Sequence, residues 1–166
     1  MTEIAANVHS VLQNIRDIAV QAGRDPNAVR LVAVTKYVKA DGVRQAIHAG
    51  VTICGENRLQ EAQEKMRDLG DQLGVNWHFI GRLQRRKLKS IVGRFALIHS
   101  VESLEQIEEV DRRAEDLDVS GGDRRDSIIL RGREVGGTHP SGSRLSVRSR
   151  ASSGSLVGCL ERRLGD

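Results

Sequence analysis

A single lysine, Lys36, stands directly after the apolar, valine-rich run from Leu31 to Thr35 and just before a segment with helical character. A primary amine beside a dry, apolar sheet has its charged form disfavoured. The neutral amine can attack an aldehyde and form a Schiff base. The alternative is an ordinary lysine that extends into solvent. The spacing alone favours this alternative, because perturbed groups indicate function only statistically.

Polar residues also stand near the ends of three further apolar runs. Asn57 follows the run 51–54, His78 lies within 77–80, and Ser100 lies next to His99 within 96–101. Ligand sites in parallel α/β folds lie at the carboxyl ends of the strands. We therefore expect these polar groups to share one face of the sheet with Lys36, and to form a ligand site together.

Each of these candidates has a structural alternative. Glu56 and Asn57 are typical of a loop that starts a helix, and His78 is equally compatible with a hydrogen-bonded core histidine on the face opposite Trp77 and Phe79. The core interpretation of His78 is the favoured one from the pattern alone. The case for a site rests on four strand ends together and on no single residue.

Hydrophobic periodicity places these residues on a regular framework. Apolar residues recur at helical spacing in five segments and form short continuous runs in four others. Gly50 is expected to end one helix, and Ser103 with Gln106 has the spacing of a capping box. The predicted helices are 3–22, 41–49, 59–73, 83–92 and 103–117, and the predicted strands are 31–35, 51–54, 77–80 and 96–101.

The alternation of strands and helices predicts a parallel sheet covered by helices. Either an open doubly wound sheet or part of a barrel satisfies this order. The chain has 166 residues, which is short for a complete eight-fold barrel of about 250 residues. We expect about four βα units in residues 1–117.

The composition changes near residue 118. Residues 118–166 hold nine Gly, nine Ser and nine Arg, with no Lys and no aromatic residue. Such a segment buries too little apolar area to offset its ordering entropy, so we expect an irregular, disordered tail. Two interpretations stay open, a natural basic tail or the product of a shifted reading frame. The run at 128–130 is the one candidate strand within it.

Several classes of protein are not expected. Cys54 and Cys159 are far apart and have neither disulfide nor metal spacing, so we expect a reducing, cytoplasmic setting and no metal. The N-terminus lacks the pattern of a signal peptide, and no apolar run approaches the ~20 residues that span a membrane. The net charge of +4 does not by itself indicate a nucleic-acid partner.

The strongly basic segment 82–90 has two interpretations. It could contact RNA or an acidic partner, which would make the chain a basic RNA-associated protein. However, it has no interleaved aromatic residues, and a solvated helix face is the favoured interpretation. We therefore do not expect a nucleic-acid partner.

Four motifs together resemble the pyridoxal phosphate homeostasis proteins, the YggS/PROSC family. They are "LVAVTK" with Lys36, "GEN" followed by "LQEAQEK", "WHFIGRLQRRKLK", and "IHSVESLE". They occur in order over residues 3–117. The resemblance implies a partial (β/α) TIM-type barrel of the fold-type III pyridoxal phosphate class, similar to the N-terminal domain of alanine racemase without its second domain.

The resemblance also implies a cofactor and its attachment. It implies that Lys36 carries pyridoxal 5'-phosphate as an internal aldimine, and that Asn57, His78 and Ser100 line the pocket. It implies a role in intracellular homeostasis of the cofactor, without established catalysis, and we expect a monomer. An amino-acid racemase is the enzymatic alternative, but it requires a second base, and the one tyrosine, Tyr37, adjoins the lysine.

The chain also departs from the family pattern. Family members continue with further strands, whose serine-containing and Gly-Thr-rich turns hold the cofactor phosphate. Here that part is replaced by the Gly/Ser/Arg segment, and "GGTHP" at 136–140 has no apolar strand beside it. A phosphate without backbone donors loses much of its anchoring. We therefore expect a chain that keeps the lysine and binds the cofactor less firmly.

Overall fold

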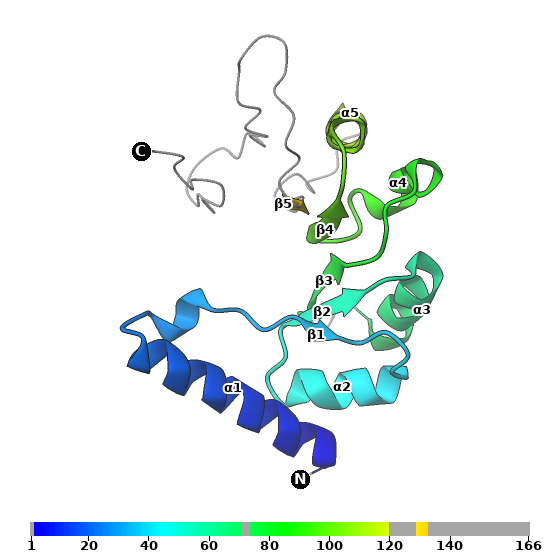
Figure 1. The fold of residues 1–166 in the computed structure, drawn as a ribbon. Coiled ribbons are helices and arrows are strands. Elements are labelled where there is room, and N and C mark those ends of the chain that lie inside the picture. Colours follow the sequence, from blue (N-terminus) through cyan, green and yellow to red (C-terminus); the bar gives the residue numbers. More distant parts are fainter. Residues whose placement is uncertain (1, 71–73, 120–128, 133–166) are drawn as a thin grey trace, which may run out of the picture.

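The computed structural model describes residues 2–70, 74–119 and 129–132 of the chain (Figure 1). Helices and strands alternate along it as the periodicity predicts. The helices are α1 (Glu3–Gln21), η1 (Pro26–Ala28), α2 (Ala40–His48), α3 (Leu59–Leu69), α4 (Arg85–Ile91) and α5 (Leu104–Val119). The strands are β1 (Ala33–Val34), β2 (Ile53–Glu56), β3 (Asn76–Phe79), β4 (Leu97–Val101) and β5 (Ile129–Gly132).

The strands form one parallel sheet in the order β1-β2-β3-β4-β5. Val34 pairs with Gly55, Gly55 with His78, and His78 with Leu97. Every connection between neighbouring strands passes through a helix, which is the arrangement that parallel pairing requires. The sequential strand order and the parallel pairing match a segment of a (β/α) barrel, so the predicted fold class is confirmed.

The helices α2, α3, α4 and α5 follow one another around one side of the sheet (Figure 1). We call the face of the sheet toward these helices the outer face and the opposite one the inner face. Alternate strand residues point to the two faces. Phe79 packs in the outer core, whereas Val34 on β1 is 52% exposed. The inner face is therefore open to solvent next to β1.

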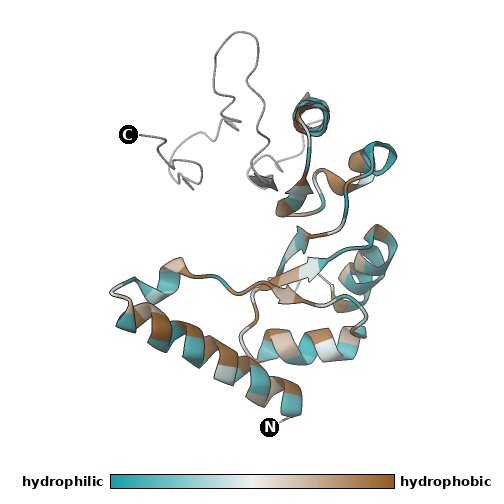
Figure 2. Cartoon of the chain, in the orientation of Figure 1, coloured by the Kyte–Doolittle hydropathy of each residue, from teal (hydrophilic) through white to brown (hydrophobic). Residues whose placement is uncertain are grey.

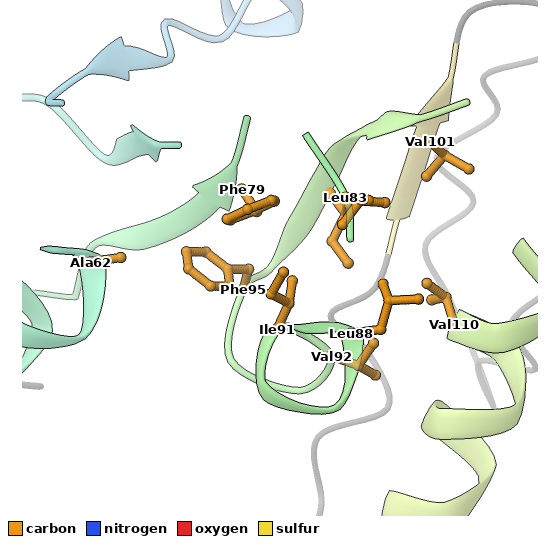
Figure 3. Packing of buried hydrophobic residues seen from close by; sticks show 10 residues of the cluster. Ala62, Phe79, Leu83, Leu88, Ile91, Val92, Phe95, Val101 and Val110 are labelled. Atoms are coloured by element: carbon orange, nitrogen blue, oxygen red, sulfur yellow. The ribbon is translucent and has the colours of Figure 1, made fainter. Parts of the chain in front are cut away.

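Two hydrophobic clusters hold the helices on the outer face. The larger one joins α4, α5, β3 and β4, and it contains the edge-to-face pair of Phe79 and Phe95, with ring centroids 5.3 Å apart (Figure 3). The smaller one, around Val43 and Cys54, joins α2 to β2. Figure 2 shows brown, apolar segments alternating with teal, polar ones along the helices. Burial of the apolar segments is the main stabilising term of the fold.

The ends of two helices follow the predicted signals. Ser103 Oγ accepts from the Gln106 backbone N–H, and Gln106 Oε1 accepts from the Glu102 N–H at 2.7 Å. This is close to a capping box, displaced by one residue at its return bond. Gly50 follows the end of α2 with φ +109°, a conformation that favours glycine.

Helix α1 departs from its predicted stripe. Ile4 and Val8 pack against the smaller cluster and Ala19 is buried, as expected. However, Val11 and Ile18 are exposed, at 44% and 66%. The reason is that α1 contacts mainly α2 and η1, so only part of its apolar stripe meets a partner among the described residues.

The sheet has one strand more than the four predicted. β5 pairs in parallel with β4 through Leu97 with Ile129 and Ile98 with Leu130. It overlaps the run at 128–130 that was the one candidate strand in the segment 118–166. Residues 120–128 and 133–166, including "GGTHP", lie outside the described residues. The prediction of a disordered tail from residue 118 therefore stays a prediction for them, although Asp118 and Val119 end helix α5.

Candidate functional site

Lys36 lies in a tight turn that follows β1. The Val38 backbone N–H donates to the Thr35 carbonyl at 3.0 Å and closes a four-residue turn, with Lys36 and Tyr37 at its centre. Tyr37 has φ +66°, and it is the one non-glycine residue with positive φ in the described chain. A bulky residue in this region is strained. The turn is thus held in its conformation by its surroundings.

The environment of Lys36 differs from the dry setting that the sequence predicts. Both Lys36 and its neighbour Val34 are exposed, whereas Thr35 between them is only 4% exposed. The amine is therefore accessible to a dissolved aldehyde. Its predicted shielding by a sheet top is not provided by residues 2–70 or 74–119.

Asn57 stands directly after β2, next to the end of β3. Its Oδ1 atom is buried and has no hydrogen-bond partner among the described residues. The backbone of Asn57 also lies so close to Gly81 that a Cβ at Gly81 would be 2.1 Å from the Asn57 carbonyl oxygen. Only glycine fits there. The two strand ends are thereby held together, and Asn57 offers an acceptor that a ligand N–H or O–H can satisfy.

His78 and His99 meet on neighbouring strands. His78 Nδ1 and His99 Nε2 are 3.0 Å apart, and the ring centroids are 5.1 Å apart. His78 is 8% exposed and lies on the face opposite Phe79, which confirms its predicted orientation. Ser100 is half-buried beside an irregularity in the pairing of β4 with β5. These residues remain candidates for the pocket.

The predicted site residues share one end of the sheet but are not linked to Lys36. Among residues 2–70 and 74–119, no hydrogen bond or ion pair joins Lys36 to Asn57 or Ser100. Glu56 was interpreted as a residue of the loop after the second strand, and this interpretation is wrong. Glu56 belongs to β2 itself, and its side chain points to the outer face and is completely buried. The strand continues two residues further than predicted, so Glu56 is a buried strand residue and not an exposed loop residue.

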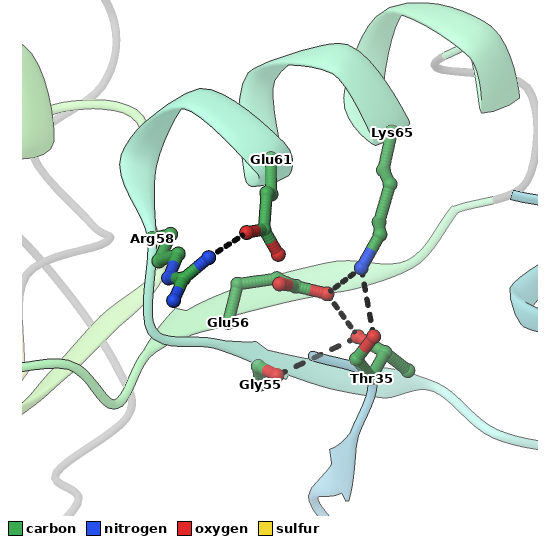
Figure 4. A network of polar contacts seen from close by, with 6 residues as sticks. All are labelled: Thr35, Gly55, Glu56, Arg58, Glu61 and Lys65. Carbon is green, nitrogen blue, oxygen red and sulfur yellow. Dashed lines mark hydrogen bonds and ion pairs between the residues drawn. The ribbon is translucent and has the colours of Figure 1, made fainter. Parts of the chain in front are cut away.

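A buried polar cluster lies directly behind the Lys36 turn (Figure 4). Lys65 on α3 donates to Glu56 Oε1 at 2.7 Å and to the Thr35 carbonyl at 2.7 Å. Thr35 Oγ1 donates to the same Glu56 oxygen at 2.6 Å. The Lys65 and Glu56 side chains are 10% and 0% exposed. A buried ion pair of this kind requires additional hydrogen bonds, and Glu56 Oε1 has them. The other carboxylate oxygen, Oε2, is buried without a hydrogen-bond partner among the described residues.

The buried cluster affects the neighbouring thiol. The pKa of Cys54 is raised to about 11, chiefly by burial and also by the Glu56 carboxylate, while Lys65 and the Thr35 hydroxyl act in the opposite direction. Cys54 is a free, completely buried thiol. It is therefore protonated and inert at neutral pH, and it has no role as a nucleophile.

The sequence analysis missed Thr35, Glu56 and Lys65 as a unit. A signal was present in helix α3. Ala62, Lys65 and Leu69 are all buried and lie on one helical stripe, so a lysine stands at a position where the periodicity calls for an apolar residue. A lysine at such a position needs a buried partner. The acid at the end of β2 was the natural candidate.

The described residues fit part of the implied cofactor. An accessible primary amine and an unsatisfied buried amide oxygen suit an aldehyde-bearing aromatic ligand. The turns expected to hold its phosphate belong to the part beyond α5, and "GGTHP" lies outside the described residues. Tyr37, the base that a racemase would require, is 71% exposed and its ring lies 5.5 Å from the Arg58 guanidinium. No described residue favours racemase chemistry over simple binding.

The basic segment forms the exposed face of α4. Leu88 and Ile91 are buried in the larger cluster, whereas Arg85, Arg86, Lys87 and Lys89 are exposed. This is the amphipathic helix of the favoured interpretation. None of the helices described here is long and apolar enough to cross a membrane. The described residues also contain no group of three or more potential metal ligands.

Comparison with known proteins confirms the resemblance seen in the four motifs. The chain is 47% identical over 104 residues to the pyridoxal phosphate homeostasis protein of Pseudomonas aeruginosa. It is 38% identical over 104 residues to the protein of that name from Aquifex aeolicus. Each alignment covers 63% of this chain and 45% of the relative. The chain thus spans a little under half the length of the curated relatives that it matches. No family model matches the chain.

Solved structures give the same result. PipY of Synechococcus elongatus, a COG0325 family member determined with pyridoxal phosphate bound, aligns with a TM-score of 0.54 and 38% identity. That alignment covers 63% of this chain and 49% of PipY. A protein of unknown function from Bifidobacterium adolescentis aligns with a TM-score of 0.65 and 34% identity, over 70% of this chain and 51% of the other. The described sheet and helices are similar to about half of each structure.

Proposed function

We propose that this chain binds pyridoxal 5'-phosphate covalently through Lys36 and takes part in the intracellular homeostasis of the cofactor. The observation that carries the proposal is the position of Lys36. It is an accessible amine in a strained turn at the carboxyl end of β1, in a sheet similar to that of a protein with bound pyridoxal phosphate.

The cofactor supplies an aldehyde, and condensation with an amine releases water and leaves a C=N bond to Nζ. The residues of this chain present the amine and orient what attaches to it. Lys36 provides the amine, and the turn between Thr35 and Val38 fixes the backbone from which its side chain extends. Asn57 and the His78–His99 pair line the neighbouring strand ends as candidate contacts.

The names of the relatives refer to homeostasis of the cofactor and to no reaction. We therefore propose binding and transfer without catalytic turnover. The buried free thiol of Cys54 is compatible with a reducing cytoplasmic compartment.

Because exposed lysines react with aldehydes non-specifically, the test has to compare lysines within one chain. Lys39 is also exposed and lies three residues from Lys36, so it is the matched internal control. The protein is incubated with a stoichiometric amount of pyridoxal phosphate, reduced with borohydride, digested and analysed by mass spectrometry. We expect the adduct predominantly on Lys36. Equal labelling of Lys36, Lys39, Lys87 and Lys89 would contradict the proposal.

A further inference from the structure

We propose that Thr35, Glu56 and Lys65 are positioning residues that hold the Lys36 turn in the conformation that presents its amine. This inference rests on the proposed attachment of an aldehyde to Lys36. It adds a group of residues on the other face of the sheet, which do not touch the attached molecule and act through the backbone.

The carbonyl group of Thr35 connects the Lys36 turn to the buried cluster. This carbonyl belongs to the peptide unit that joins Thr35 to Lys36. It accepts from the Val38 N–H at 3.0 Å, which closes the turn, and from Lys65 Nζ at 2.7 Å. A movement of the turn that rotates this peptide unit therefore breaks a hydrogen bond to a buried ammonium. Hydrogen bonds of that kind are stronger than neutral ones.

The turn itself is strained. Tyr37 has φ +66° although it is neither glycine nor asparagine. Such a conformation persists only where the surrounding structure fixes it. Two contacts do so: the Lys65 bond to the Thr35 carbonyl, and the Arg58 guanidinium over the Tyr37 ring at 5.5 Å. Glu61 holds Arg58 at 2.7 Å (Figure 4).

The cluster also joins two strand ends to one helix. Glu56 is the last residue of β2 and directly precedes Asn57, and Lys65 belongs to α3. The Thr35 side chain and main chain both take part in the cluster. The backbone positions from which Lys36 and Asn57 extend are thus linked through the Lys65–Glu56 ion pair and its hydrogen bonds to Thr35.

Global stability is an alternative reason for the ion pair. Replacing a buried ion pair by apolar residues is often neutral or stabilising, so global stability is a weak explanation for this one. A role in fixing one local conformation explains why the pair is located behind the one strained turn of the described chain.

The test uses the double variant Glu56→Gln/Lys65→Met, which removes the bond to the Thr35 carbonyl and leaves no uncompensated buried charge. The control is Glu109→Gln/Arg113→Met, which removes an ion pair of 2.9 Å on α5, far along the chain from the turn. Two quantities are measured in each protein and in the unaltered chain: amide hydrogen exchange at Val38, and the ratio of reductively trapped pyridoxal phosphate on Lys36 to that on Lys39.

In the double variant we expect Val38 exchange to rise about tenfold and the Lys36 to Lys39 ratio to fall by a similar factor, which is the effect of losing one charge-assisted bond. The control should change neither. If the double variant exchanges at Val38 like the unaltered chain, or if core amides such as Ile98 accelerate equally, the positioning role is wrong.

Two further outcomes are separable. If the double variant does not fold, Thr35→Val keeps the carbonyl, removes the hydroxyl bonds to Glu56 and to the Gly55 carbonyl, and should accelerate Val38 exchange about threefold; no acceleration would overturn the inference. If the unaltered chain shows no preference for Lys36 over Lys39, the proposed function fails, while Val38 exchange still decides whether the cluster holds the turn.

Discussion

Lys36 follows strand β1 and Lys65 lies on helix α3, and the two lysines have opposite environments. Lys36 is exposed and has no ion-pair partner among the described residues, whereas Lys65 is 8% exposed and pairs with Glu56 at 2.7 Å. The difference arises from what covers each face. Helices α2 to α5 enclose the outer face, and the inner face next to β1 is open.

The two lysines show that the position of a side chain at a strand end and its shielding from water are separate properties, although the sequence pattern predicts both together. The end of a parallel strand fixes where a side chain starts, and that part of the prediction holds for Lys36. The dryness of its surroundings depends on the elements that pack against the face. The buried amine in this region is that of Lys65 on α3, which donates to the carbonyl of Thr35, the residue before Lys36.

The largest expected effect follows from removing one member of the buried pair. Lys65→Met leaves the Glu56 carboxylate buried without its cation, and we expect it to lower the free energy of unfolding by about 3–5 kcal/mol. Urea denaturation followed by circular dichroism measures this change.

The matched control for Lys65→Met is Arg113→Met on α5. Its partner Glu109 also contacts Arg112 and is more accessible, so we expect a loss of less than about 1 kcal/mol. Similar losses for the two variants would mean that the two ion pairs have the same environment. The Lys65–Glu56 pair would then not be more strongly shielded from solvent than the Arg113–Glu109 pair.

The second prediction compares one residue type on the two faces. Val43 on α2 is 0% exposed, and Val34 on β1 is 52% exposed. Val43→Ala removes two buried methyl groups and should destabilise the fold by about 2 kcal/mol, whereas Val34→Ala should change it by less than about 0.5 kcal/mol. If Val34→Ala is equally destabilising in thermal unfolding, the inner face is covered in solution.

The framework of the fold was predictable because its signals are local. The helix that follows Ser103 has its cap and its apolar stripe within a few residues, and the strand at 97–101 begins with the apolar pair Leu97 and Ile98 and ends with Val101. The helix predicted at 103–117 spans Leu104–Val119, and the strand predicted at 96–101 spans Leu97–Val101. The predicted helix 59–73 instead ends at Leu69, where Gly70 follows with φ +67°.

The site was less predictable because burial of a polar side chain depends on distant partners. Glu56 and Lys65 are nine residues apart and belong to different elements, and Thr35 is thirty residues from Lys65. No spacing rule links the three. The exposure of Lys36 could not be predicted either, because it depends on which elements cover the inner face rather than on the residues around the lysine.

The third prediction uses the thiol on the covered face. Because the pKa of Cys54 is raised to about 11 from an ordinary value of 9.0, the folded state binds this proton more tightly than the unfolded state does. The stabilisation is complete below about pH 9 and is lost as the pH rises through about 11. We expect the free energy of unfolding to fall over this range.

Lysine and tyrosine side chains titrate in the same range, so the comparison requires a variant without the thiol. In a Cys159→Ser background, Cys54→Ala should lose part of the decline between pH 9 and 11, as measured by urea denaturation at several pH values. Identical pH profiles with and without Cys54 would show that its surroundings are not dry.

The smallest expected effect is the most informative about the lysine itself. Lys36→Ala removes an exposed side chain with no described partner, so the free energy of unfolding should change by less than about 0.5 kcal/mol. Trapping of pyridoxal phosphate in the 36–38 peptide is lost in the same protein. A stability loss comparable to that of Lys65→Met would mean that Lys36 is buried and paired in solution. The inner face would then be closed by residues outside the described part, and the amine would have the shielding that the sequence pattern predicts.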